Sequence, residues 1–291
     1  MQRMKSIDRA TLLVRPGHRV HLQRIDTAAT GPFSTKADAH AQRRHDRRRL
    51  SDAQERLYAD KRYALLIILQ GMDTAGKDGA IRHVTKGVSP QGIDVHAFAE
   101  PSPRELAHDY LWRTTKALPE RGRIAIFNRS YYEELTVVRV HADQLANEHL
   151  PETPHANLWH ERYEDINAFE RHLTRNGTIV LKFFLHLSKD EQRKRLLARI
   201  DAPEKNWKIS AADLRDRDAW DRYQHAYEQL LTATSTACAP WHIIPADHKW
   251  FARAAIADAI VDRLEELDLT YPTPSKAQRE ILDAQRRQLE G

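Results

Sequence analysis

The feature that most constrains the fold is an unbroken apolar run that leads directly into a glycine-containing loop. Residues 63–70 read YALLIILQ, and residues 71–77 then fit the pattern G-x-x-x-x-G-K. A run that is apolar at consecutive positions is typical of a strand buried on both faces of a parallel sheet. A helix-forming stretch over residues 77–86 follows the loop. This order of strand, loop and helix predicts a phosphate-binding P-loop.

Further apolar runs alternate with helix-forming stretches along the rest of the chain. This alternation predicts an α/β fold of the P-loop type with three layers, a parallel sheet of about five strands with helices on both faces. The expected strands are 63–70, 93–99, 122–127, 178–187 and 241–245, and the expected helices are 35–61, 77–86, 102–118, 163–175, 188–200, 216–235 and 250–267.

The pattern also divides the chain into a core and two flanks. We expect residues 1–62 to form an arm and a helix that pack on the core, and residues 63–270 to form the P-loop domain. Residues 271–291 are expected to be a tail, and residues 201–215 an irregular basic stretch. Ligands of such sheets bind beyond the carboxyl ends of the strands, so the functional residues are expected in the loops after the strands.

Composition favours a cytoplasmic protein with an anionic partner. The chain has 291 residues, a net charge of +5 and one cysteine. The positive excess favours nucleotide, polyphosphate or nucleic acid as a partner, and one cysteine fits a reducing compartment. No apolar run approaches the roughly 20 residues that cross a bilayer, and no signal peptide is visible, so we expect no membrane partner.

The predicted P-loop has the groups that bind phosphate. Successive backbone N–H groups form an anion-binding nest, and the helix that follows adds the positive end of its dipole. Lys77 reaches phosphate oxygens as a point charge. The candidate phosphate-binding residues are Gly71, Thr74, Ala75, Gly76, Lys77, Asp78 and Gly79.

Two carboxylates in the same loop point to a metal ion. Asp78 stands where ATP-using P-loop enzymes have a serine or threonine hydroxyl, and Asp73 lies inside the loop. Acids beside a phosphate would repel it unless a cation lies between them or they accept a proton. We therefore expect Asp73 and Asp78 to hold Mg²⁺, with Mn²⁺ as the alternative. A second interpretation of Asp78 is that it stabilises the dipole of its own helix.

The loop after the third strand carries the next set of candidates, in the sequence FNRSYYEE (residues 127–134). Arg129 is suited to neutralising a transferred phosphate, or else pairs with a nearby glutamate. Tyr132 either stacks on a base or packs in the core. Arg139 faces either phosphates or solvent. The candidate nucleotide-binding residues are Asn128, Arg129, Tyr132, Glu133 and Arg139, and the candidate catalytic residues are Asp73, Lys77 and Arg129.

Four motifs together resemble the type-2 polyphosphate kinase family, over about residues 15–267. They are GMDTAGKDG in the P-loop, FNRSYYEE after the third strand, NWK at 206–208 and WDRY at 220–223. The resemblance implies a thymidylate-kinase-like fold with a mobile lid, here around residues 188–215. It also implies Mg²⁺-dependent phosphate transfer from inorganic polyphosphate to nucleoside mono- or diphosphates.

The resemblance also assigns roles to particular residues. Asp73 matches the catalytic, metal-binding loop acid of the family, and Lys77 matches its loop lysine. Asn128 and Arg129 match the Walker B motif, in which many members have aspartate at the first position. The asparagine puts a second carboxylate ligand in doubt and resembles the subgroups that accept AMP, or both AMP and ADP. The choice between adenine and guanine nucleotides stays open.

Two basic clusters lie outside these motifs. Lys205 and Lys208 of the lid are expected to contact polyphosphate, together with the helix residues Arg193, Lys194, Arg195 and Arg199. The cluster Arg43, Arg44, Arg47, Arg48 and Arg49 either is solvated, joins subunits or binds phosphate. Because this cluster and the C-terminal tail could join subunits, we expect a homo-oligomer, a dimer or a tetramer.

Two other functions fit parts of the sequence. An ATP-dependent nucleoside monophosphate kinase would share the P-loop, but the carboxylate of Asp78 argues against it. A nucleic-acid-binding P-loop protein would use the basic helices, but no reader motif with interleaved aromatic residues is visible, so nucleic acid is not the expected partner. A donor assay with polyphosphate and ATP separates the first alternative, and DNA binding without turnover would support the second.

Overall fold

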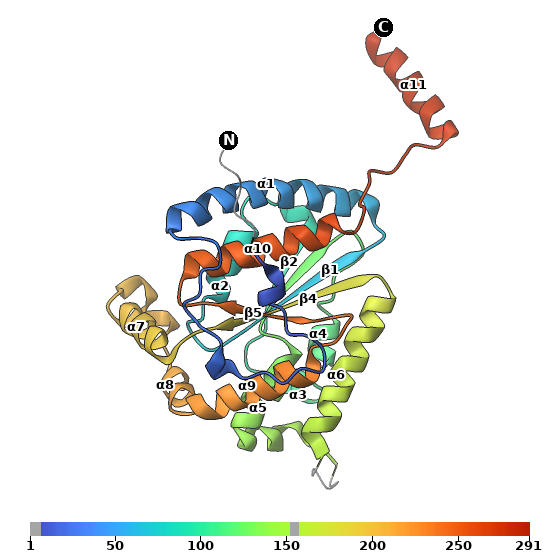
Figure 1. Ribbon diagram of the computed structural model, residues 1–291. Coiled ribbons are helices and arrows are strands. Elements are labelled where there is room, and N and C mark those ends of the chain that lie inside the picture. The colour runs from blue at the N-terminus through green and yellow to red at the C-terminus, as the bar shows by residue number, and fades with distance from the viewer. Residues whose placement is uncertain (1–6, 152–156) are drawn as a thin grey trace.

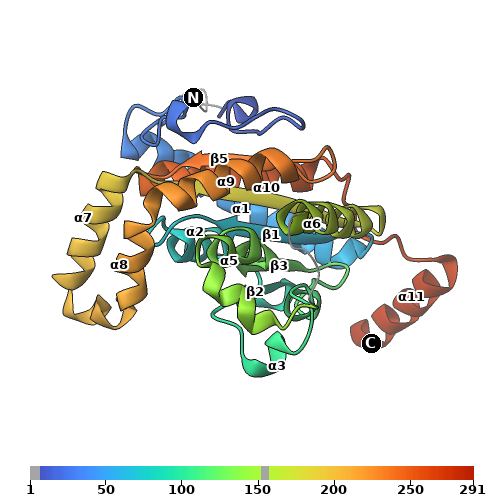
Figure 2. The same cartoon turned by 90° about the horizontal axis from the view of Figure 1, so that it is seen from below.

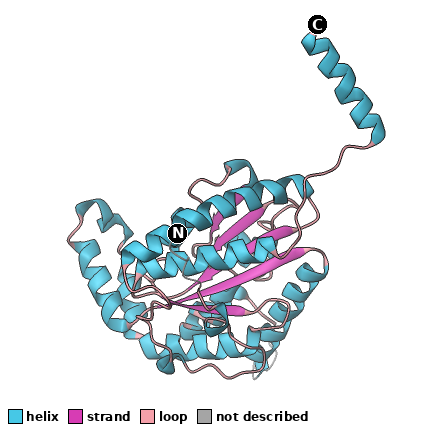
Figure 3. Cartoon of the chain, turned by 45° about the horizontal axis from the view of Figure 1, so that its top comes forward, coloured by secondary structure: helices cyan, strands magenta, loops and turns pink. Residues whose placement is uncertain are grey.

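Five parallel strands form one sheet through the middle of the molecule, in the order β2-β3-β1-β4-β5 (Figures 1 and 3). The computed structural model describes residues 7–151 and 157–291, and it leaves the side chain of Lys208 undescribed. The strands are β1 (Ala64–Gln70), β2 (Ile93–Ala97), β3 (Ile124–Asn128), β4 (Thr178–His186) and β5 (Trp241–Pro245). The predicted α/β fold with a parallel sheet is confirmed, and each strand lies within two residues of its predicted bounds.

Helices cover both faces of the sheet (Figures 1 and 2). The α-helices are α1 (Lys36–Asp60), α2 (Lys77–Val84), α3 (Pro103–Leu106), α4 (Trp112–Thr115), α5 (Val137–Val140), α6 (Leu158–Arg175), α7 (Lys189–Ile200), α8 (Ala211–Asp218), α9 (Trp220–Thr234), α10 (Lys249–Glu265) and α11 (Lys276–Glu290). Short 3₁₀ helices include η2 (Leu22–Arg24), η4 (Tyr131–Leu135) and η7 (Pro203–Lys208).

The central strand β1 shows why the sequence is apolar at consecutive positions. Successive side chains of a strand point to opposite faces, and both faces of this strand are covered. Leu65, Ile67 and Leu69 join the core beneath α1, α2 and α10. Leu66 and Ile68 join the core beneath α6 and α9. All seven residues of β1 are buried, so the strand fixes the position of the loop that follows it.

The N-terminal arm covers the outer edge of β5. The amide of Val14 donates to the carbonyl of Trp241 (2.8 Å), and the amide of Ile243 donates to the carbonyl of Leu12 (2.7 Å). These bonds satisfy backbone groups that an open edge strand would leave unpaired. Within the described residues, no helix is both long and apolar enough to span a membrane.

The helix predicted over residues 102–118 is wrong. The capping box of Ser102 and Glu105 forms as predicted, but α3 ends at Leu106, and α4 begins only at Trp112. Between the two helices, the carboxylate of Asp109 accepts a hydrogen bond from the amide of Leu111 (2.9 Å). A local bond of this kind competes with the helical ladder and favours a turn.

The chain after β4 is also more helical than its sequence suggested. Residues 201–215 contain η7 and the start of α8, and Ser210 and Asp213 form the capping box that begins α8. Helices α7 and α8 project together from the body (Figure 2), which is the place predicted for a lid. The tail also contains a helix, α11, which stands apart from the body (Figure 1) and buries no residue.

A buried carboxylate lies on α1, which packs side by side with α10. Asp46 is fully buried, accepts a hydrogen bond from Gln42 (2.8 Å) and lies 3.5 Å from a guanidinium nitrogen of Arg49. Burial, and next the charge of Asp258 on α10, raise its pKa from 3.8 to about 7; Glu265 adds to this, whereas Gln42 and Arg49 oppose it.

The raised pKa predicts how stability depends on pH. The folded chain holds the proton of Asp46 more tightly than the unfolded chain, so the free energy of unfolding falls as pH rises between the two pKa values. We expect Asp46→Asn to raise the free energy of unfolding by about 1–2 kcal/mol at pH 8 and by less at pH 5, measured by urea unfolding. Asp52→Asn, at an exposed position of the same helix, is the control. Equal effects of the two substitutions at pH 8 would contradict this account.

Candidate active site

The loop between β1 and α2 takes backbone angles that its glycines allow. Gly71 and Gly76 have φ angles of +147° and +112°, which side-chain-bearing residues rarely adopt. A Cβ atom on Gly71 would lie 2.8 Å from the carbonyl oxygen of Leu185, so the close approach of the loop to β4 also requires glycine there. Thr74 takes a φ of +64° without being glycine. The predicted loop therefore forms, at the carboxyl end of the central strand.

Lys77 occupies the inner side of this loop. Its ammonium group is buried and donates hydrogen bonds to the carbonyl oxygens of Gly71 (2.5 Å) and Met72 (3.3 Å). Burial, and next the charge of Arg129, lower the pKa of Lys77, whereas Asp73, Glu133 and Asp78 raise it. The charge of Lys77 is therefore influenced by one other cation, Arg129, and by three nearby carboxylates.

Two consecutive residues at the end of β3 each contact one of the loop acids. The side-chain amide of Asn128 donates to Asp78 (2.9 Å), and the guanidinium of Arg129 donates to Asp73 (3.1 Å). Arg129 also lies 3.6 Å from Glu133. The charges of Glu133 and then of Asp73 raise the pKa of Arg129 above its ordinary range, although burial opposes them. The structure therefore brings together six of the residues that the sequence singled out, Asp73, Lys77, Asp78, Asn128, Arg129 and Glu133.

The oxygen donors at the loop fit a Mg²⁺ ion. Asp73 and Asp78 are the carboxylates, and Asn128 contacts Asp78 through its amide nitrogen, which leaves its carbonyl oxygen as a further candidate. Among the described residues, no group of three or more His, Cys, Asp or Glu could hold a metal on its own. Mg²⁺ is usually bound by one or two carboxylates together with substrate phosphates and water, which is the number of carboxylates that Asp73 and Asp78 provide.

The family model of polyphosphate kinase 2 (PPK2) matches residues 34–271. The chain belongs to the polyphosphate kinase 2 family. The resemblance noted in the sequence is thereby confirmed.

Several relatives match nearly the whole chain. The ADP-polyphosphate phosphotransferase of Rhodopseudomonas palustris is 51% identical, over 95% of this chain and 96% of the relative. The AMP/ADP-polyphosphate phosphotransferase of Meiothermus ruber is 44% identical, over 92% and 97%. The crystal structure of polyphosphate kinase 2 from Arthrobacter aurescens TC1 has a TM-score of 0.85 and 40% identity, over 94% of this chain and 95% of that chain.

Arg195 supports the P-loop of this family member from behind, a role that the sequence did not reveal. It was expected to contact polyphosphate from the lid helix, but it is buried. Its guanidinium donates to the carbonyl oxygens of Thr74 and Ala75 (3.0 Å each) and of Ala246 and Asp247 (2.7 and 2.9 Å). One arginine of α7 therefore ties the loop after β1 to the loop after β5, and Gln192 of the same helix donates to the carbonyl of Asp73 (3.3 Å).

Tyr132 does not occupy a nucleotide site in this structure. Its side chain is fully buried, and its hydroxyl contacts Glu170 and Lys182 at 2.8 Å each. Lys182 and Glu170 form an ion pair at 2.6 Å with both side chains buried. Tyr131 donates to the same glutamate (2.8 Å). Of the two roles that the sequence left open for Tyr132, packing in the core is therefore the one that fits.

Arg139 also lies away from the P-loop. Its guanidinium packs over the rings of Trp159 and Tyr163 and donates to the hydroxyl of Tyr163. These residues line a cavity of about 610 Å³ that includes none of the loop residues. Aromatic residues of α6 hold the side chain in this position, and a contact between Arg139 and a bound nucleotide stays a prediction.

Lys205 of the predicted lid pairs with a neighbouring acid in this structure. Lys205 is exposed on η7, at the outer end of the α7–α8 projection (Figure 2), and pairs with Glu204 at 3.3 Å. The side chain of Lys208 lies outside what the structure describes. Contact between these lysines and polyphosphate remains a prediction.

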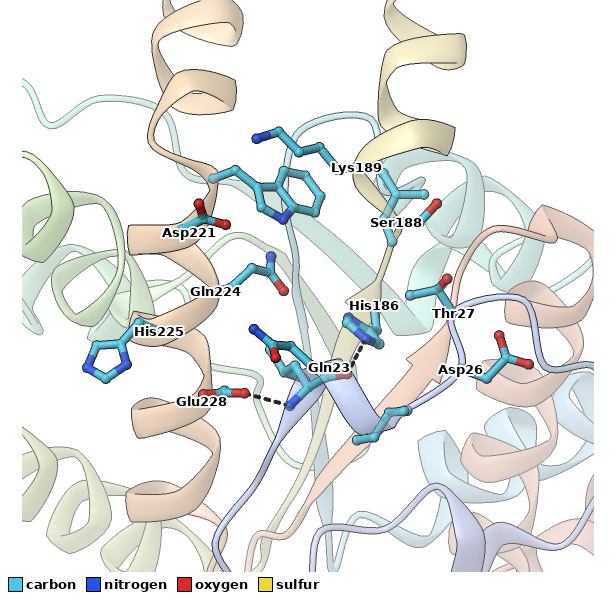
Figure 4. A pocket seen from close by; sticks show the side chains of 14 residues that line it. Gln23, Asp26, Thr27, His186, Ser188, Lys189, Asp221, Gln224, His225 and Glu228 are labelled. Atoms are coloured by element: carbon cyan, nitrogen blue, oxygen red, sulfur yellow. Dashed lines mark hydrogen bonds between the residues drawn. The ribbon is translucent and has the colours of Figure 1, made fainter.

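A second cavity lies beside the start of α7 (Figure 4). It has a volume of about 540 Å³ and is enclosed by the arm, the end of β4 and α9. His186 and Glu228 line it and bind the backbone of Leu22, through its carbonyl (3.1 Å) and its amide (2.7 Å). None of the predicted site residues lines this cavity, so it is separate from the P-loop site.

The contacts of Arg195 predict a large effect on stability. Arg195→Ala would leave four backbone carbonyls without their donor, so we expect the free energy of unfolding to fall by about 2–4 kcal/mol. Lys194→Ala, at the exposed neighbouring position, should change it by less than about 0.5 kcal/mol. Urea unfolding measures both variants. If Arg195→Ala were as stable as Lys194→Ala, the supporting role would be wrong.

Proposed function

We propose that this protein transfers phosphoryl groups from inorganic polyphosphate to AMP and ADP in a Mg²⁺-dependent reaction. The observation that carries the proposal is the paired arrangement at the P-loop. Lys77 is buried inside the loop. Its two acids, Asp78 and Asp73, accept hydrogen bonds from Asn128 and Arg129. Two relatives support it, because they are named as AMP/ADP- and ADP-polyphosphate phosphotransferases and are 44% and 51% identical over more than nine-tenths of the chain.

The residues of this site serve mainly to position the two substrates and to neutralise negative charge on the transferring phosphoryl group. The backbone N–H groups of the loop and Lys77 bind the reactive end of the donor. Arg129, at 3.1 Å from Asp73, is placed to offset charge on the oxygens of the transferring group. When bound, Mg²⁺ would be held by Asp73 and Asp78 and would supply further neutralisation of that charge.

The chemical step needs no strong general base. A terminal phosphate oxygen of the nucleotide is already ionised, and it forms a new bond to the end phosphorus of polyphosphate. The bond between that phosphorus and the bridging oxygen breaks, and the oxygen remains on the shortened chain with its electron pair. Most of the rate enhancement therefore comes from alignment and from electrostatic stabilisation.

Asn128 affects both the number of carboxylates that can hold the metal ion and the choice of acceptor nucleotide. Its amide donates to Asp78. An aspartate in the same place would put two carboxylates at hydrogen-bonding distance and would require a cation or a proton between them. We infer that this chain holds Mg²⁺ with one carboxylate fewer than an aspartate-bearing site. AMP and ADP are the proposed acceptors, and guanine nucleotides are the second set to test.

We further propose a cytoplasmic homo-oligomer. One exposed free cysteine, Cys238, fits a reducing compartment.

The apolar side chains Ile281, Leu282 and Leu289 of α11 are 57%, 52% and 88% exposed. A short helix with such a stripe is marginal in isolation, so a second copy of the chain is the proposed partner for this surface. Light scattering of the full chain and of a chain that ends before α11 tests this.

The proposed function predicts the outcome of a donor assay. Polyphosphate with Mg²⁺ should phosphorylate AMP and ADP, and EDTA should abolish the reaction. Lys77→Ala and Asp73→Asn should each lower kcat/KM by about 10²- to 10³-fold, because both groups act on the transferring phosphate. Arg175→Ala, an exposed position at the end of α6, is the control and should leave the rate unchanged.

Two results would overturn the proposed function. Turnover with ATP as donor but none with polyphosphate would make the protein a nucleoside monophosphate kinase. Full turnover in EDTA would remove the metal from the mechanism. The nucleotide formed is separated by chromatography, so transfer to AMP and transfer to ADP are measured independently.

A further inference from the structure

The structure divides the arginines of α1 into two groups. Arg49 forms an ion pair and hydrogen bonds with Glu265 of α10. Arg43 and Arg47, one helical turn apart on another side of α1, are half-buried. Within residues 7–151 and 157–291, neither makes an ion pair or a side-chain hydrogen bond, and Nε of Arg43 is shielded from solvent without a partner. Arg49 is therefore structural, whereas Arg43 and Arg47 have no counterion in the described chain.

Helices α2 and α10 bring more cations to the same surface. Arg253 of α10 lies against the first turn of α2, where a Cβ atom on Gly79 would be 2.8 Å from its Nη2. Arg47 lies against the turn after α2, where a Cβ atom on Gly87 would be 3.3 Å from its Cδ. Arg82 is exposed on α2 between these two points. The cluster therefore follows the whole length of the helix that begins at Lys77.

The electrostatic effects within this cluster agree with its geometry. Burial, and then Arg253 and Arg47, lower the pKa of Arg43. Burial, and then Arg195 and Arg82, lower the pKa of Arg253. Burial, and then the charges of Arg43, Arg253 and Arg47, lower the pKa of His83 to about 4. The positive charges of this cluster therefore lie close enough to affect one another. They extend to Arg195, which donates to a carbonyl oxygen of the P-loop.

A half-buried group of like charges lowers stability unless anions bind to it. A single phosphate ion would contact only one or two of these cations. A linear chain of phosphates, each carrying charge, would meet all of them in turn. The cluster starts beside Gly79, two residues after the P-loop lysine, so it lies where a polyanion bound at the loop could continue.

We propose that Arg43, Arg47, Arg82 and Arg253 form a second binding site for the phosphate donor, which holds the part of a long polyphosphate beyond the P-loop. This site rests on the proposed function, because it takes polyphosphate to be the donor. It makes the affinity for the donor depend on chain length, while the chemistry at Lys77 stays the same. A short donor that fills only the P-loop does not reach Arg43 and Arg47, because Arg47 lies beside Gly87, past the far end of α2.

The double variant Arg43→Ala/Arg47→Ala tests this site, with long-chain sodium polyphosphate and tripolyphosphate as the two donors. We expect KM for the long chain to rise roughly tenfold, and kcat with either donor and KM for tripolyphosphate to stay unchanged. The slope of log KM against log salt concentration should decrease by about 1 for the long chain alone. Arg43→Lys/Arg47→Lys keeps the charges and should retain most of the long-chain affinity.

Matched controls make the result interpretable. Arg171→Ala/Arg175→Ala removes two exposed arginines from α6, on the other face of the sheet, and should leave both KM values unchanged. Unfolding curves establish that each variant is folded, and Arg253→Gln provides a second test on a different helix, should the double variant not fold.

Three outcomes would overturn this inference. One is an unchanged KM for the long chain, and another is an equal rise in KM for both donors. The third is loss of binding to single-stranded nucleic acid without any change in polyphosphate kinetics, which would assign the surface to another polyanion. Absence of transfer from both donors by the unmodified protein would instead reject the proposed function, so the two failures are distinguishable.

Discussion

The arrangement of charges around one buried ammonium group governs the rest of the site. Lys77 lies inside its own loop, and the two acids of that loop would repel a phosphate bound there. The loop is compatible with an anion because Asn128 and Arg129, which follow one strand, each contact one of the acids. Strand β3 lies next to β1 in the sheet, so parallel pairing of these two strands sets the register between the acids and their partners.

Two buried polar networks hold these parts in place from outside the site. Arg195 binds the carbonyls of the P-loop and of the loop after β5. On the other side of the sheet, Glu170 and Lys182 bind the two tyrosines that follow Arg129. Buried polar groups of this kind are costly to leave unpaired, so each network favours a single position of its loop. The site is therefore preorganised by residues that do not face the substrate.

The sequence predicted those parts of the fold and site in which the chemistry is local. All five strands and the loop at 71–77 followed from apolar runs and glycine spacing, because each signal lies within one element. The helix over 102–118 was wrong because a single carboxylate, Asp109, stabilises a turn within an otherwise helical pattern. The environments of Tyr132 and Arg195 could not be predicted, because their partners come from segments more than 30 residues away along the chain.

By itself, then, the sequence determined the fold class and the P-loop, since spacing along the chain is enough to specify a strand, a glycine-containing loop and a helix. The tertiary structure alone decided which charges are neighbours. It paired Asp73 and Asp78 with Arg129 and Asn128, assigned Arg195 to support the loop, and placed Arg43 and Arg47 beside α2 and Arg253. Electrostatic energy depends on distance in space, which the order of residues does not contain.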